Sequence, residues 1–171
     1  MIRSLAVILI PLLIITVFFT RNLGDHPVKV VDWKPVLTQA RSEAPYPVLA
    51  PVNLPDTWRA TQASWVKVGQ RTDNDAPSVR NAWTLGFLDP SQTYISLYQG
   101  DLQSDDLVRS ATREATADGS STIEGQTWER RVSPDQRTRS LVLITPEVTT
   151  VVAGDTSYEA LESYVSTLRS S

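Results

Sequence analysis

Apolar residues fill the start of the chain almost without interruption. Residues 4–20, SLAVILIPLLIITVFFT, carry no charged side chain and are bounded by Arg3 and Arg21. A membrane-spanning helix needs about 17–25 mainly apolar residues, and the long arms of flanking arginines extend its reach. Pro11 lies mid-segment, where a lipid-embedded helix tolerates proline better than a soluble one does. We therefore predict that residues 1–21 form a single transmembrane anchor.

The alternative for this segment is a cleaved signal peptide. Such a peptide has a shorter apolar core, about 7–15 residues, followed by a cleavage site of small residues. Here the segment ends in the bulky pair Phe18 and Phe19 and continues directly to Arg21. The pattern favours an uncleaved anchor.

The orientation of the anchor depends on the charges that flank it. Arg3 precedes the segment, whereas Arg21, Lys29 and Lys34 follow it. Taken literally, the positive-inside rule would leave the folded part in the cytoplasm. However, a very short N-terminus usually stays inside, and long domains are translocated largely regardless of flanking charge. We therefore expect a single-pass protein of the cell membrane with an extracytoplasmic C-terminal domain.

Proline dominates the stretch that follows. Residues 22–57 hold six of the eleven prolines, and each one biases the residue before it towards extended backbone. We predict an extended stalk over 22–57 without a helix. Its apolar positions between residues 45 and 57 suggest docking on the domain, although a semi-rigid free stalk remains the alternative. Trp33 is expected at the level of the lipid headgroups, where indole rings partition well.

From Trp58 onwards the pattern changes to short strands separated by turn residues. Residues 89–92 and 133–136 each carry proline in second place, which favours a tight turn between two strands. The strands are predicted at residues 59–69, 81–88, 93–99, 122–132, 138–145 and 147–153.

Two segments have helical patterns. Residues 104–117 begin with polar capping residues and stop before Gly119, and residues 156–168 begin with Thr156 and Glu159, the spacing of a capping box. Each helix follows a run of strands, which suggests a βββα unit used twice.

Together these elements predict an α+β domain over residues 58–171. A repeated βββα unit gives a roughly six-stranded, mainly antiparallel sheet with both helices on one face.

Composition narrows the function. The chain has 16 basic and 19 acidic residues, for a net charge of −3, and without residues 1–21 the charge is about −5. Because duplex binding draws on a basic face, we expect no nucleic-acid partner. The chain has no cysteine, which excludes disulfides, thiolate metal sites and thiol catalysis.

Candidate catalytic groups are few. His26 is the single histidine and lies in the predicted stalk, so Ser-His-Asp catalysis and histidine metal sites are not expected. The acidic residues Asp101, Asp105 and Asp106 lack the ligand spacing of a calcium loop, and a helix N-terminus favours such charges. We predict no cofactor and no metal. A hydrolase that uses two carboxylates on envelope glycans remains open, although no pair is singled out.

Four arginines are the candidate binding residues. Arg130, Arg131, Arg137 and Arg139 flank one predicted turn and form a local basic cluster on an acidic domain. Such a cluster would suit anionic lipid headgroups or an anionic polymer. The alternative is a solvated hairpin whose arginines pair with nearby glutamates.

Aromatic residues are the second feature that could mark binding, because several of them lie on predicted strands. We expect these side chains to belong to the core rather than to a ligand platform. They are Trp65, Trp83, Tyr94, Tyr98 and Trp128.

Several motifs carry a resemblance to a known family. They are RSLAVILIPLL in the anchor, PYPVLAPVNLPDTWRATQASW, W-x-L-G-F at Trp83 to Phe87, TYISLYQG at Thr93 to Gly100, GQTWE at Gly125 to Glu129 and VVAG at Val151 to Gly154. With them the chain resembles, over nearly its whole length, the actinobacterial membrane-anchored proteins grouped as domain of unknown function 4245. The resemblance implies an envelope protein with an N-terminal anchor and no assigned activity.

These observations favour a non-catalytic binding or accessory domain of the cell envelope, whose partner is an unknown envelope protein or an anionic polymer. A carboxylate-dependent hydrolase and a structural subunit of a membrane complex are the alternatives.

Overall fold

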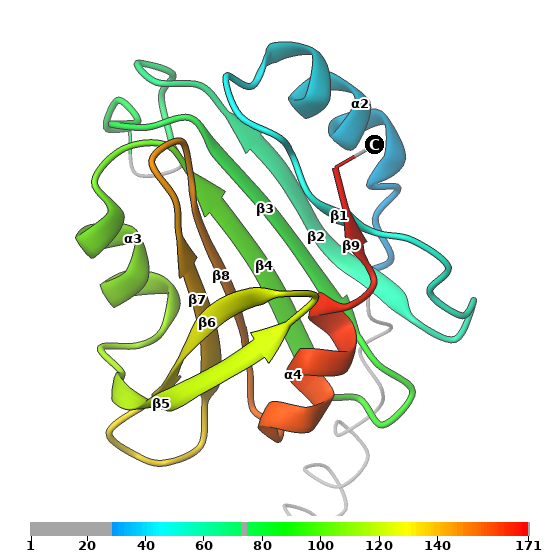
Figure 1. Ribbon diagram of the computed structural model, residues 1–171. Helices are drawn as coiled ribbons and strands as arrows, with labels where there is room; N and C mark the ends of the chain where they lie inside the picture. Colours follow the sequence, from blue (N-terminus) through cyan, green and yellow to red (C-terminus); the bar gives the residue numbers. More distant parts are fainter. Residues whose placement is uncertain (1–28, 73–74, 171) are drawn as a thin grey trace, which may run out of the picture.

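The computed structural model describes residues 29–72 and 75–170 (Figure 1). The predicted anchor over residues 1–21 and the first part of the predicted stalk lie outside these residues. Within the described part of the chain, no helix has the length and apolar character needed to cross a membrane.

A seven-stranded antiparallel sheet forms the centre of the domain (Figure 1). Every strand runs antiparallel to its neighbours, which confirms the predicted α+β class with a mainly antiparallel sheet. A separate two-stranded sheet pairs β1 (Ala50–Pro51) with β9 (Leu168–Arg169). In sheet order, the seven strands are β2 (Arg59–Val66), β3 (Ala82–Leu88), β4 (Tyr94–Gly100), β8 (Thr149–Gly154), β7 (Arg139–Ile144), β6 (Gln126–Val132) and β5 (Thr116–Ile123).

The strand missing from the prediction is β5, at one edge of the sheet. The helix predicted over residues 104–117 ends at Ala111, because Arg113 and Glu114 adopt positive φ angles of 57° and 58° that no α-helix can continue. The next residues form β5, whose first five residues are all exposed. An edge strand with a solvated surface lacks the apolar alternation that identifies a strand in a sequence.

Two helices lie on opposite faces of the sheet, so the prediction that they share one face is wrong. Helix α4 (Tyr158–Val165) belongs to the core cluster that includes Leu141 and Val152. Helix α3 (Ser104–Ala111) belongs to a second cluster with Val142 and Val151, the neighbouring positions on the same two strands. Successive residues of a strand point to opposite faces, and here both faces are apolar. The strand pattern therefore could not show which face each helix covers.

The two halves of the chain are also less alike than a repeated βββα unit requires. Strands β2 to β4 precede α3, but four strands, β5 to β8, precede α4. The halves meet at the antiparallel pair β4–β8, and a two-fold axis that exchanges these strands would be perpendicular to the sheet. Such an axis would place both helices on the same face. The opposite placement breaks that symmetry.

A third helix, α2 (Lys34–Glu43), lies within the predicted stalk, so the expectation of an extended segment without a helix is wrong there. Pro35 occupies the first turn, where the missing N–H costs no hydrogen bond. The following proline, Pro45, comes after the helix has ended. The prolines thus bound this helix rather than break it.

The segment after α2 docks on the sheet. Tyr46 and Val48 are 5% and 2% exposed and belong to the main core. The indole N–H of Trp83 donates to the carbonyl of Leu49 at 3.0 Å, and the side-chain oxygen of Gln99 accepts from the Leu49 N–H at 2.7 Å. Residues 46–49 are therefore part of the folded domain.

Candidate binding pocket on the α3 face

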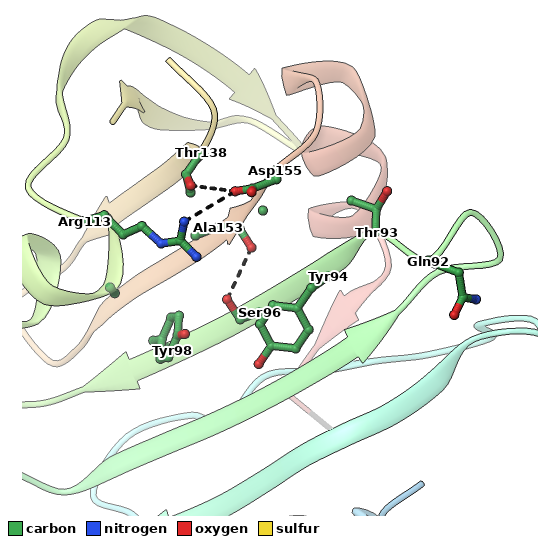
Figure 2. A pocket seen from close by; sticks show the side chains of 11 residues that line it. Gln92, Thr93, Tyr94, Ser96, Tyr98, Arg113, Thr138, Ala153 and Asp155 are labelled. Atoms are coloured by element: carbon green, nitrogen blue, oxygen red, sulfur yellow. Dashed lines mark hydrogen bonds and ion pairs between the residues drawn. The ribbon is translucent and has the colours of Figure 1, made fainter. Parts of the chain in front are cut away.

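A pocket of about 340 Å³ opens on the face of the sheet that α3 covers only in part (Figure 2). An eight-residue helix is about 12 Å long, whereas a seven-residue strand spans about 23 Å. Gly100 lets the helix pack closely at one end of β4, because a Cβ there would lie 3.1 Å from Leu107 Cδ2. Its other end stays open. The pocket is lined by Gln92, Thr93, Tyr94, Ser96, Tyr98, Ala111, Arg113, Thr138, Ala153, Gly154 and Asp155.

Strand β4 supplies the floor through alternate residues. Tyr94, Ser96 and Tyr98 point to the same face, and the two tyrosines flank the serine (Figure 2). The Tyr94 ring lies over Gly86 of β3, where an added Cβ would approach Tyr94 Cζ to 2.7 Å. From there its hydroxyl donates to Gln62 Oε1 at 2.8 Å. Glycine at position 86 thus permits the ring position that shapes the floor.

Burial keeps the Tyr94 hydroxyl protonated. Desolvation, aided by the nearby Tyr98, raises the pKa of Tyr94 to about 12. Next to it, Ser96 is 3% exposed and donates to the carbonyl of Ala153 at 3.3 Å. The floor is therefore formed by two aromatic rings with hydroxyl groups and by a serine.

Charged groups lie at the mouth of the pocket around Asp155. Thr138 donates to Asp155 Oδ1 at 2.6 Å and fixes the carboxylate (Figure 2). Arg113 approaches the same oxygen at 3.9 Å, and Arg137 approaches Oδ2 at 3.5 Å. Two guanidinium groups therefore share one carboxylate.

Both ion pairs are loose, since the Arg113 and Arg137 side chains are 65% and 74% exposed. Exposed pairs of this kind are worth about 0–1 kcal/mol, so the arginines can turn to another anion at little cost. A guanidinium binds carboxylate or phosphate through two parallel hydrogen bonds. The mouth of the pocket suits an anionic group for this reason.

The pocket has few of the side chains that hydrolysis or metal binding requires. Among the described residues that line it, Asp155 is the single carboxylate, whereas glycosidases use two. No group of three or more His, Cys, Asp or Glu side chains gathers as a metal site in residues 29–72 and 75–170. The polar groups that line the pocket are hydroxyls, the Gln92 amide, the Asp155 carboxylate and the Arg113 guanidinium.

The structure separates the four arginines predicted to form one cluster. Arg130 and Arg139 lie on the α4 side, with their guanidinium carbons 4.8 and 5.8 Å from the centre of the Tyr158 ring. Arg131 lies on the α3 face and pairs with Glu129 at 3.1 Å. Arg137 does not line the pocket itself, but it alone of the four pairs with a lining residue, Asp155.

On the α4 side, Arg130 is held in a local network. Its guanidinium lies 2.6 Å from Glu162 Oε1, which also accepts from the Ser121 hydroxyl at 2.5 Å. Hydrogen bonds from Ser121 and then Arg130 lower the pKa of Glu162 from its ordinary 4.5. This arginine therefore has a structural partner.

Sequence reasoning missed most of the pocket. The strand pattern predicts Tyr94 and Tyr98 as core residues, whereas in the structure they line the pocket. In the structure Ser157 caps α4 and accepts from the Ala160 N–H at 3.3 Å, so the predicted capping box at Thr156 is wrong. The signal available in the sequence was the alternation of polar Tyr94, Ser96 and Tyr98 along β4.

The fold and the pocket define an α+β domain built on an antiparallel sheet, with a pocket on the face that α3 covers in part. The chain belongs to the family described as Protein of unknown function (DUF4245), whose model matches residues 1–168. This match confirms the resemblance drawn from the motifs. No curated protein matches the chain.

Proposed function

We propose that this protein is a membrane-anchored, non-catalytic binding domain of the cell envelope. Its pocket on the α3 face takes an anionic, hydroxyl-bearing group of an envelope polymer. The observation that carries the proposal is the convergence of Arg113 and Arg137 on Asp155 at the mouth of a tyrosine-floored pocket.

Two properties of the pocket support a sugar-like anion. Tyr94 and Tyr98 offer ring surface on which an apolar sugar face can pack, and Thr138 and Ser96 bring hydroxyls to the same wall. A carboxylate or phosphate on the ligand would displace Asp155 as the partner of the loosely held guanidiniums.

The uninterrupted apolar segment at residues 4–20 supports the anchor. A domain held at a membrane by one helix meets polymers attached to that membrane at high effective concentration, so a weak site can serve. The family match adds no activity, because the family is described as one of unknown function.

Titration of the full chain in detergent, followed by NMR, tests the proposed site. The probes are D-glucuronate, inorganic phosphate and, as a neutral reference, D-glucose. We expect glucuronate to bind more tightly than glucose and to shift the signals of Tyr94, Tyr98 and Thr138. The double variant Arg113→Ala/Arg137→Ala should lose most of this affinity.

The matched control is Arg71→Ala/Arg109→Ala. These arginines are also exposed and paired with aspartates, but they lie away from the pocket. Equal losses in the two double variants would mean that net charge, rather than the pocket, attracts the probe. Equal binding of glucose and glucuronate would contradict the role given to the arginines.

A further inference from the structure

A second hollow lies at the same end of the sheet as the pocket but on the opposite face. It measures about 390 Å³ and is lined by Trp33, Leu54, Trp58 and Phe87 among others. Trp33 directly precedes α2, Trp58 directly precedes β2, and Phe87 is near the end of β3. We call this hollow, which these residues line, the tryptophan hollow.

The aromatic rings of the hollow form one packed group. Trp33 and Trp58 meet Phe87 edge to face, with ring centres 5.8 and 6.4 Å apart. Behind them Trp58 stacks on Tyr164 at 5.8 Å with an interplanar angle of 18°. Phe87 and Tyr164 are buried, whereas the two tryptophans are half-buried and line the opening. The hollow therefore has an aromatic wall, and Lys34, Asn53 and Asp56 add polar groups to its lining.

These two tryptophans differ from Trp65 and Trp83 in their hydrogen bonds and from Trp128, whose indole N–H also lacks a partner, in their exposure. The indole N–H of Trp65 donates to Glu43 at 2.8 Å, and that of Trp83 donates to Leu49. Within the described residues, the indole N–H groups of Trp33 and Trp58 have no hydrogen-bond acceptor. A half-buried ring with an unused donor suits a membrane interface, where one end of the indole is apolar and the other is hydrated.

The chain itself brings this end of the domain to a bilayer. This step rests on the proposed anchor at residues 4–20. A chain spans at most about 3.6 Å per residue, so the nine residues from Thr20 to Lys29 keep Lys29 within about 32 Å of the end of that segment. Trp33 is four residues further along.

The charged residues around the tryptophan hollow indicate whether it would bind anionic headgroups or the neutral interfacial layer. Lys29, Lys34 and Arg59 lie at this end of the domain, and Asp32, Asp56 and Asp89 balance them. The surface therefore lacks the basic excess that binds anionic headgroups.

We propose that the tryptophan hollow docks on the interfacial layer of the bilayer that holds the anchor. Trp33 and Trp58 insert among the lipid carbonyls and headgroups, largely independently of lipid charge. At this end of the sheet Leu88 of β3 pairs with Tyr94 of β4, and Tyr94 lines the pocket on the α3 face. Docking would therefore also bring that pocket close to the membrane surface.

The test uses the full chain reconstituted in vesicles of phosphatidylcholine, with or without a brominated analogue that quenches tryptophan fluorescence. We expect quenching in neutral vesicles that rises little when an anionic lipid is added. Trp33→Phe/Trp58→Phe should remove most of the quenching. The control Trp65→Phe, which replaces a core tryptophan 7% exposed, should leave it unchanged.

Vesicle flotation separates the two proposals. A chain that does not float contradicts the anchor and, with it, the proposed function. A chain that floats but whose quenching is the same with and without Trp33 and Trp58 overturns the docking alone. Photo-crosslinking from Trp33→p-benzoylphenylalanine gives a second measurement: a lipid adduct supports docking, and a protein adduct in its place overturns it.

Discussion

The two faces of the central sheet use the same strands for different purposes. On the face covered by α2 and α4, one core cluster runs from Leu37 to Leu168 and includes Trp65, Trp83 and Trp128. On the face covered by α3, the cluster consists of four small side chains. Beside it lie buried polar groups such as Ser96 and Ser140.

We interpret this contrast as a division between the face that stabilises the fold and the face that holds the proposed binding pocket. Large apolar side chains bury the most apolar surface on folding, and each Å² buried stabilises the fold by about 25 cal/mol. Concentrating them on one face leaves the other free to keep polar groups, and even Ser140, whose hydroxyl is buried with no partner among the described residues. The α3 face can therefore hold a hollow that a tightly packed core would fill.

Truncating one buried residue on each face would test this division with the largest expected effect. Leu161→Ala in α4 removes a fully buried side chain and should lower the free energy of unfolding by about 2–5 kcal/mol. Val108→Ala in α3 removes fewer atoms from a smaller cluster and should cost clearly less. Thermal unfolding of the full chain in detergent, followed by near-UV circular dichroism, measures both. Equal costs would show that the α3 face contributes as much to stability.

An intermediate effect is expected at Gly86 on the α3 face. Gly86→Ala places a Cβ where the Tyr94 ring now lies, so the ring must move, at a cost of about 1–3 kcal/mol. The affinity of the folded variant for glucuronate should also fall, because the moved ring displaces the floor of the pocket.

The matched variant is Tyr94→Phe. It keeps the ring and removes the hydroxyl that donates to Gln62, a loss of about 1 kcal/mol. If both variants bind glucuronate like the wild type, as titrated by NMR, the floor of the pocket has no part in binding.

The smallest effect concerns pH on the α4 side. The pKa of Glu162 is lowered in the folded protein, so its contribution is complete above the ordinary value of 4.5 and is lost as the pH falls through the folded pKa. Glu162→Gln should therefore be less stable than the wild type at neutral pH, by less than about 1 kcal/mol because the pair is about a third exposed. Below pH 4.5 the two melting temperatures should converge. A difference that stays constant from pH 7 to pH 3 would show that Glu162 does not act through its charge.

In the second half of the chain, the sequence predicts strands β7 and β8 correctly but misses β5. β7 and β8 carry long apolar runs and were predicted within a few residues of their ends. β5 was missed because its exposed residues give no periodic signal. Of the four predicted arginines, Arg137 alone pairs with a residue that lines the pocket, Asp155. Arg130 pairs with Glu162 and Arg131 with Glu129, and Arg139 donates to the carbonyl of Thr156.

The sequence by itself determined the class of the fold, the family and most of the strands, since these follow from local alternation, turn residues and motif order. Only the tertiary structure decided which face each helix covers and where the pocket opens. Strands such as β7 and β8 are apolar on both sides, so their pattern fits either placement of the helices. The choice depends on contacts between residues far apart in the chain, and these contacts leave no local trace.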